Sequence, residues 1–167
     1  MTQRLDYFKQ PSAREPLLAL SALSGYLRDS DLDPVLMELI QLRASQLNGC
    51  AFCVDMHTKD LAAAGEDGAR VYLLTTWREA NVHSLAERAA LAWTEALTRL
   101  DSGADLNACY TELAMHFSTA DILNITFTVV AINSWNRLSV GFGKEPGAYR
   151  PGDLDGSLKK ALQVLRH

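Results

Sequence analysis

The 167-residue sequence predicts an all-α protein built from antiparallel helices. Three observations carry this prediction. Apolar residues recur at helical spacing along most of the chain, no alternation with a period of two is sustained, and several segments begin with residues that cap helix N-termini. No clear internal repeat and no linker interrupt the pattern, so we expect one domain over residues 1–167.

Start and stop signals divide the chain into its expected elements. Asp33 followed by Pro34 is a start signal, and Asn48-Gly49 is a stop signal because this pair accepts the left-handed conformation of a helix C-terminus. Ser84 and Glu87 form a capping box. The expected order is an irregular arm over 1–15, helices over about 16–28, 34–47, 50–64, 66–77, 84–100, 105–117 and 118–140, an irregular segment over 141–156 and a short helix over 157–166.

The composition excludes several classes of protein. Hydrophobic residues make up 48% of the chain and the net charge is −4 without any basic block, which predicts a globular protein that does not bind nucleic acid. The most apolar stretch, 122–132, is too short to span a membrane. No secretory leader is visible, and three cysteines do not form the framework of a secreted disulfide-rich protein. We therefore expect a cytoplasmic protein.

The stretch from Glu38 to Leu61 holds the residues that a function must explain. Cys50 and Cys53 form a C-x-x-C pair, and His57 follows one turn later on the same face of the expected helix. Glu38 lies on the preceding helix, where it forms a polar stripe with residues 41 and 45. A helix junction therefore brings together two polar, reactive faces.

This pattern favours thiol redox chemistry, and it leaves the attacking cysteine open. The two sulfur atoms can form a reversible disulfide within one helical turn. The helix N-terminus favours Cys50 as the thiolate, whereas His57, four residues on, favours Cys53 as the thiol that loses its proton. Glu38 is compatible either with orienting His57 or with an ordinary solvated position.

Zinc binding and simple packing are the competing interpretations. Cys50, Cys53, His57 and Glu38 are all acceptable zinc ligands, although structural zinc cysteines usually lie on turns or knuckles. Two small buried cysteines and a packed histidine are the plainest alternative. The polar residues around Trp135 either line a pocket, form a subunit contact or face solvent.

The run from Glu38 through Gln46-Leu-Asn-Gly-Cys50-Ala-Phe-Cys53-Val-Asp-Met-His57 resembles the AhpD-like alkylhydroperoxidases of the carboxymuconolactone decarboxylase family. The glutamate, the cysteine pair and the histidine all match at the family's spacing, and the resemblance covers roughly 20–100. It is looser over the last third, which includes the tail at 141–167. Some members carry a histidine between the cysteines, where this chain has Ala51 and Phe52.

The resemblance implies an AhpD-like helical bundle that assembles into trimers or hexamers. It implies reduction of hydroperoxides by a thiol mechanism without heme or flavin. For the full cycle we expect a dithiol protein as the reductant and no metal or other cofactor. By position, Cys53 would be the peroxidatic cysteine, Cys50 the resolving cysteine, and Glu38 and His57 the proton relay. The alternatives are a general dithiol-disulfide oxidoreductase or redox sensor, and a non-enzymatic helical oligomer whose cysteine pair is structural or binds zinc.

Overall fold

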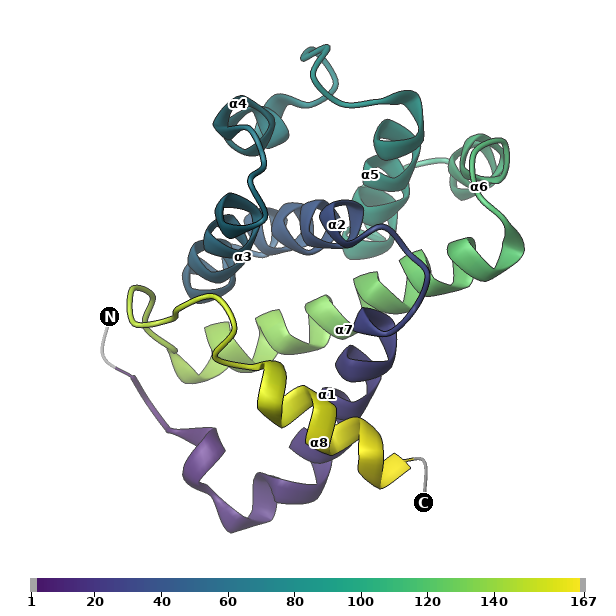
Figure 1. The fold of residues 1–167 in the computed structure, drawn as a ribbon. Coiled ribbons are helices and arrows are strands. Elements are labelled where there is room, and N and C mark those ends of the chain that lie inside the picture. The colour runs from purple at the N-terminus through teal and green to yellow at the C-terminus, as the bar shows by residue number, and fades with distance from the viewer. Residues whose placement is uncertain (1–2, 166–167) are drawn as a thin grey trace.

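The computed structural model describes residues 3–165, and every regular element in that range is a helix (Figure 1). The prediction of an all-α, AhpD-like bundle is confirmed. The α-helices are α1 (Arg14–Arg28), α2 (Pro34–Leu47), α3 (Ala51–Ala63), α4 (Gly68–Tyr72), α5 (Leu85–Thr98), α6 (Leu106–Ala114), α7 (Thr119–Phe142) and α8 (Asp155–Leu165). Short 3₁₀ helices cover Tyr7–Lys9, Pro11–Ala13 and Leu73–Thr76.

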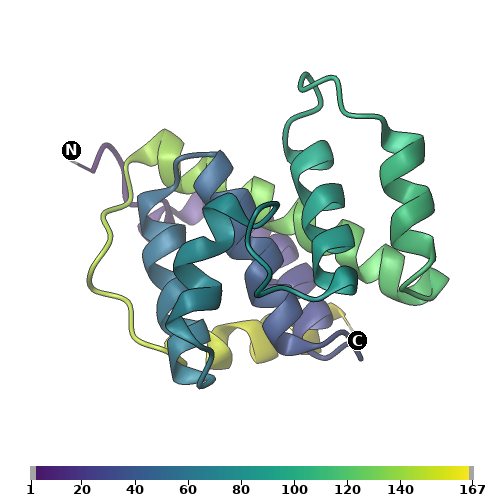
Figure 2. The same cartoon turned by 90° about the horizontal axis from the view of Figure 1, so that it is seen from above.

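Helix α2 forms the centre of the bundle. It packs against α3, α5 and α7, while α8 lies along α1 and α6 lies beside α5 (Figures 1 and 2). Leu39, Ile40 and Leu42 are completely buried, and the buried residues of α2 lie around most of its circumference, apart from a polar stripe that includes Glu38. A helix with so wide an apolar surface is stable when other elements cover it, and this explains its central position.

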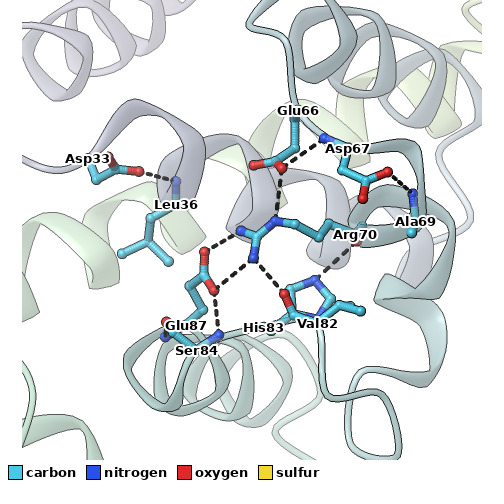
Figure 3. Close-up of polar contacts among 10 residues, drawn as sticks. All are labelled: Asp33, Leu36, Glu66, Asp67, Ala69, Arg70, Val82, His83, Ser84 and Glu87. Atoms are coloured by element: carbon cyan, nitrogen blue, oxygen red, sulfur yellow. Dashed lines mark hydrogen bonds and ion pairs between the residues drawn. The ribbon is translucent and has the colours of Figure 1, made fainter.

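The predicted capping signals are all present. The Asp33 carboxylate accepts a hydrogen bond of 2.8 Å from the backbone N–H of Leu36 (Figure 3), and Ser84 closes its capping box with Glu87. A second capping box, between Ser118 and Asp121, opens α7. Each cap satisfies backbone donors that a helix N-terminus leaves unpaired.

Several predicted boundaries differ from the structure. The arm over 1–15 is not irregular throughout, because it contains two 3₁₀ helices and the start of α1 at Arg14. The terminal helix begins at Asp155 instead of residue 157, and α7 continues to Phe142. The arm is ordered by long-range contacts: Tyr7 is buried against the Phe142 ring, which no local pattern reveals.

The sequence predicts that its most apolar stretch, 122–132, is too short to span a membrane, and the lengths of the helices can be compared with that prediction. Across residues 3–165, none of the helices combines the length and the apolar character that crossing a bilayer requires.

Arg70 ties the short helix α4 to the N-terminus of α5 (Figure 3). Its guanidinium donates to Glu66 at 2.8 Å, to Glu87 at 2.5 Å and to the carbonyl of Val82 at 2.6 Å. Burial alone would raise the pKa of Glu87, but hydrogen bonds from Arg70 and Ser84 outweigh it and hold the pKa below its usual value. These polar contacts of Arg70 join α4 to α5.

We expect Arg70→Met to lower the free energy of unfolding by about 1–3 kcal/mol, because it leaves the half-buried carboxylate of Glu87 without its main partner. The lowered pKa means that this stabilisation is complete above roughly pH 4.5 and is lost as the pH falls through the lowered value. Urea unfolding at pH 7 and at pH 3 measures both effects. Arg14→Met, at an exposed position, is the control. Equal urea midpoints of unfolding for the two variants at pH 7 would contradict the stabilising role of Arg70.

Candidate active site

The site begins at the sharp break between α2 and α3. Gly49 adopts a left-handed conformation with φ +66°, which reverses the chain directly after the C-cap Asn48. Cys50 is then the N-cap of α3, and its sulfur accepts a hydrogen bond from the backbone N–H of Cys53 at 3.3 Å. The break therefore places one cysteine at the positive end of a helix and the other in its first turn.

Cys50 and Cys53 lie within disulfide-bonding distance, with their Cα atoms 5.3 Å apart. Each residue is only 1% exposed, and Ala44 and Ile132 pack against the pair. The cysteines therefore face protein and not bulk solvent. The third cysteine, Cys109, is free, half-buried and located on α6.

His57 and Glu38 meet across the α2–α3 hairpin. The Nδ1 atom of His57 lies 2.7 Å from Oε2 of Glu38, and the two side chains are 4% and 14% exposed. An ionised carboxylate can only accept, so Nδ1 carries the proton and Nε2 is left bare in the neutral ring. That Nε2 atom is buried and has no hydrogen-bond partner among the described residues. It is available as a base.

Asp60 and Tyr149 extend this polar group, and the sequence analysis missed both. The Tyr149 hydroxyl donates to the Asp60 carboxylate at 2.9 Å. Burial and the nearby charge of Glu38 raise the pKa of Asp60, and burial together with the Asp60 carboxylate raises the pKa of Tyr149. Asp60 follows His57 by one helical turn, a spacing that could have identified it; Tyr149 comes from a segment without any pattern.

The group of described residues best placed to hold a cation differs from the predicted zinc set. Potential ligand atoms of Glu38, His57 and Asp60 lie within 4.8 Å of one another, and the two cysteines do not belong to this group. The cysteines instead lie close enough to bond to each other. This separation disfavours the zinc alternative that combined both cysteines with the histidine and the glutamate.

A mostly apolar cavity of about 90 Å³ adjoins the cysteine helix. Both Cys53 and His57 line it, and its apolar wall includes Leu27, Met37, Met56, Ile132 and Trp135. The indole N–H of Trp135 donates to Ser24 at 3.0 Å, so the ring is held against α1. Trp135 itself therefore lines the cavity, whereas the polar residues around it do not: Asn133 and Asn136 hydrogen-bond to Asn48, and Arg137 is exposed.

A buried amide network fastens the helix junction to α7. Asn136 is 1% exposed; its carbonyl oxygen accepts from the Asn48 side chain at 2.9 Å and its N–H donates to Ser45 at 3.0 Å. The Ser45 hydroxyl in turn donates to the carbonyl of Gln41 at 2.7 Å. Part of the predicted polar stripe on α2 is thus structural, because it holds α7 in place.

The family model described as "Carboxymuconolactone decarboxylase family" matches residues 15–96, a range that contains the cysteine pair, His57 and Glu38. An uncharacterized protein of Bacillus subtilis (strain 168), YdfG, is 35% identical over 143 residues, which cover 86% of this chain and 96% of the relative. This chain belongs to the carboxymuconolactone decarboxylase family.

Solved structures place it in the AhpD-like part of the carboxymuconolactone decarboxylase family. One of them is a protein of unknown function from Agrobacterium tumefaciens that is described as a "Putative Antioxidant Defence Protein AhpD". It is 38% identical to this chain with a TM-score of 0.83, and the match covers 89% of this chain and all of that chain. An uncharacterized peroxidase-related protein from Silicibacter sp. TM1040 has a TM-score of 0.71 at 24% identity, over 83% and 74% of the two chains. The second likeness concerns the fold alone.

We expect Asn136→Ala to lower the free energy of unfolding by about 1–3 kcal/mol, because it removes the shared partner of the buried Ser45 and the half-buried Asn48. Denaturant unfolding measures the change. Asn124→Ala is the matched control on the same helix, since no hydrogen bond joins the Asn124 side chain to another residue in the described range 3–165, and we expect it to stay within about 0.5 kcal/mol of the wild type. Equal losses in the two variants would refute the role of the network.

Proposed function

We propose that this protein is a thiol-dependent peroxidase that reduces hydroperoxides at Cys53. The observation that carries the proposal is that Cys53 and His57 line one cavity, while Cys50 lies within bonding distance of Cys53 and Glu38 contacts His57. Membership of the carboxymuconolactone decarboxylase family supports an enzymatic, peroxidase-related role. No single one of these features would suffice.

The proposed reaction needs no group besides the two thiols and the relay. Nε2 of His57, with Nδ1 held by Glu38, accepts the proton of the Cys53 thiol. The thiolate attacks the distal peroxide oxygen, the O–O bond breaks, and the alcohol leaves with a proton from the relay. Cys53 is then a sulfenic acid. The Cys50 sulfur attacks it, water leaves, and a disulfide forms.

A dithiol protein completes the cycle in this proposal. It reduces the Cys50–Cys53 disulfide by thiol–disulfide exchange through a mixed disulfide. A reducing compartment such as the cytoplasm supplies partners of this kind. The same pair also suits a dithiol-disulfide oxidoreductase that does not use peroxide, and the rate of the reaction of Cys53 with a hydroperoxide separates the two activities.

We also propose a homo-oligomer, in line with the trimers or hexamers expected from the sequence. Leu123, Phe127 and Val130 lie at successive turns of one face of α7, and each is about half exposed. Apolar side chains in a row on one helix face are typical of a subunit contact.

The order of the two cysteines can be tested by intact mass after a slight excess of cumene hydroperoxide. We expect the reduced wild type to lose two hydrogens, and Cys50→Ser to gain one oxygen that a sulfenic-acid-specific dione captures. Cys53→Ser should do neither. Cys109→Ser is the control and should behave as the wild type, because Cys109 lies on α6 outside the cavity. Oxidation of Cys53→Ser at the wild-type rate would overturn the assignment.

The relay can be tested with Glu38→Gln. We expect the second-order rate constant of the reduced enzyme with cumene hydroperoxide to fall by about 10²-fold at pH 7, because a neutral amide no longer holds the proton on Nδ1 of His57. Stopped-flow fluorescence over pH 5–9 should also show a displaced pH profile, which a loss of packing alone would not produce. Glu79→Gln, at an exposed position, is the control. An unchanged rate and profile would remove Glu38 from the mechanism.

A further inference from the structure

Lys144 brings a cationic side chain to the cavity that holds Cys53. It follows Gly143, whose left-handed conformation (φ 70°) ends α7, and its backbone N–H donates to the carbonyl of Ser139 at 2.9 Å. Its side chain lines the cavity together with Cys53 and His57. A glycine C-cap thus returns the chain to the bundle directly beside the reactive helix.

Two aromatic rings hold the ammonium group of Lys144. The Nζ atom lies 4.4 Å from the centre of the Phe8 ring and 3.8 Å from that of Phe52, and both rings line the same cavity. Phe52 is one of the two residues between the cysteines. Ring faces attract a cation but supply no hydrogen-bond acceptor. The rings therefore hold the group in place without supplying an oxygen or nitrogen acceptor for its N–H donors.

No side chain described in the range 3–165 neutralises this ammonium group by direct contact. Neither an ion pair nor a hydrogen bond joins Nζ to any of these residues. Burial lowers the pKa of Lys144, and the charge of Asp6 only partly opposes this effect. The Asp6 carboxylate contacts Lys9 instead, at 3.0 Å. The other cation at the cavity, Arg28, is paired with Asp155.

A partly desolvated cation without a counter-ion is costly unless a ligand supplies the counter-charge. Here the surrounding wall is apolar and aromatic, formed by residues such as Leu27, Ile132 and Trp135. An inorganic anion gains nothing from contact with an apolar wall. An organic anion with a hydrocarbon body can pair its charge with Lys144 and pack its hydrocarbon part against the wall. Charge and wall together define one class of ligand.

We propose that the cavity binds amphipathic carboxylates, with the carboxylate on Lys144 and the hydrocarbon chain along the apolar wall. The preferred oxidants of Cys53 are then hydroperoxides of fatty acids. The preference for fatty-acid hydroperoxides rests on the proposed peroxidase function, whereas the binding of carboxylates does not. Lys144 would act as a specificity residue that positions the substrate and takes no part in proton transfer.

Binding is tested with octanoate and 1-octanol, a pair that differs mainly in charge, by isothermal titration calorimetry on the reduced protein. We expect octanoate to bind at least tenfold more tightly than 1-octanol, and Lys144→Gln to remove this preference while leaving 1-octanol unchanged. Lys160→Gln, on the exposed side of α8, is the control. Equal affinity for the two ligands in the wild type, or octanoate affinity unaffected by Lys144→Gln, would overturn the proposal.

Turnover is tested with linoleic acid hydroperoxide and its methyl ester. The wild type should prefer the acid by about tenfold or more in kcat/KM, mainly through KM, and Lys144→Gln should react equally with both. If neither peroxide reacts but octanoate binding depends on Lys144, the proposed peroxidase function is wrong and the binding of amphipathic carboxylates is supported. If both peroxides react equally in the wild type, the proposed preference for carboxylates is wrong and the peroxidase function is supported.

Discussion

The structure depends on the reversal of the chain at Gly49. A left-handed residue between two helices lets α2 and α3 run back along each other, so that residues equally distant from the turn lie side by side. Glu38 and Asp60 are equally distant from Gly49 along the sequence, and both lie beside His57. A side chain at position 49 would be strained in this conformation even though space for a Cβ exists. The carboxylates and the imidazole are brought together by backbone geometry.

Holding this turn inside the protein requires buried polar groups to find partners. Ser45, Asn48 and Asn136 satisfy one another between the α2–α3 junction and α7, on the side of the junction where the cysteines pack. The imidazole of His57 differs from these groups, because Glu38 binds one nitrogen and the other has no hydrogen-bond partner in the described part of the chain. A buried atom without a partner lowers stability, and such an exception is common where a group must react.

Local signals predicted most of the fold. The caps at Asp33, Ser84 and Ser118 are set by contacts within four residues, so the sequence alone reveals them. The constellation of Glu38, the two cysteines and His57 was predictable for the same reason, since one short hairpin contains it. β-branched residues such as those in the run 126–130 have a local preference for strands, yet this segment is helical because Ile125 and Val129 are buried in the core.

Contacts between distant segments could not be predicted from local patterns. Phe8, Lys144 and Tyr149 come from segments expected to be irregular, and each reaches the α3 region only through the packing of the whole bundle. The glycine-rich composition of residues 141–156 correctly indicated a lack of regular structure over 143–154, whereas the two ends of the segment belong to α7 and α8. Composition carries no information about which element such a segment lies against, and so these residues were missed.

The geometry of the cysteine pair bears on which step limits the proposed cycle. Cys50 and Cys53 share the first turn of α3, with Cα atoms 5.3 Å apart, so a disulfide can form without unwinding the helix. Resolution of a sulfenic acid should therefore need no large conformational change. Reduction is different, because both residues are 1% exposed and a protein dithiol needs direct access to a sulfur atom. We therefore expect access of the reductant to the sulfur atoms to be the slow step of such a cycle, and Phe52 and Lys144 line the surface pocket that reaches Cys50.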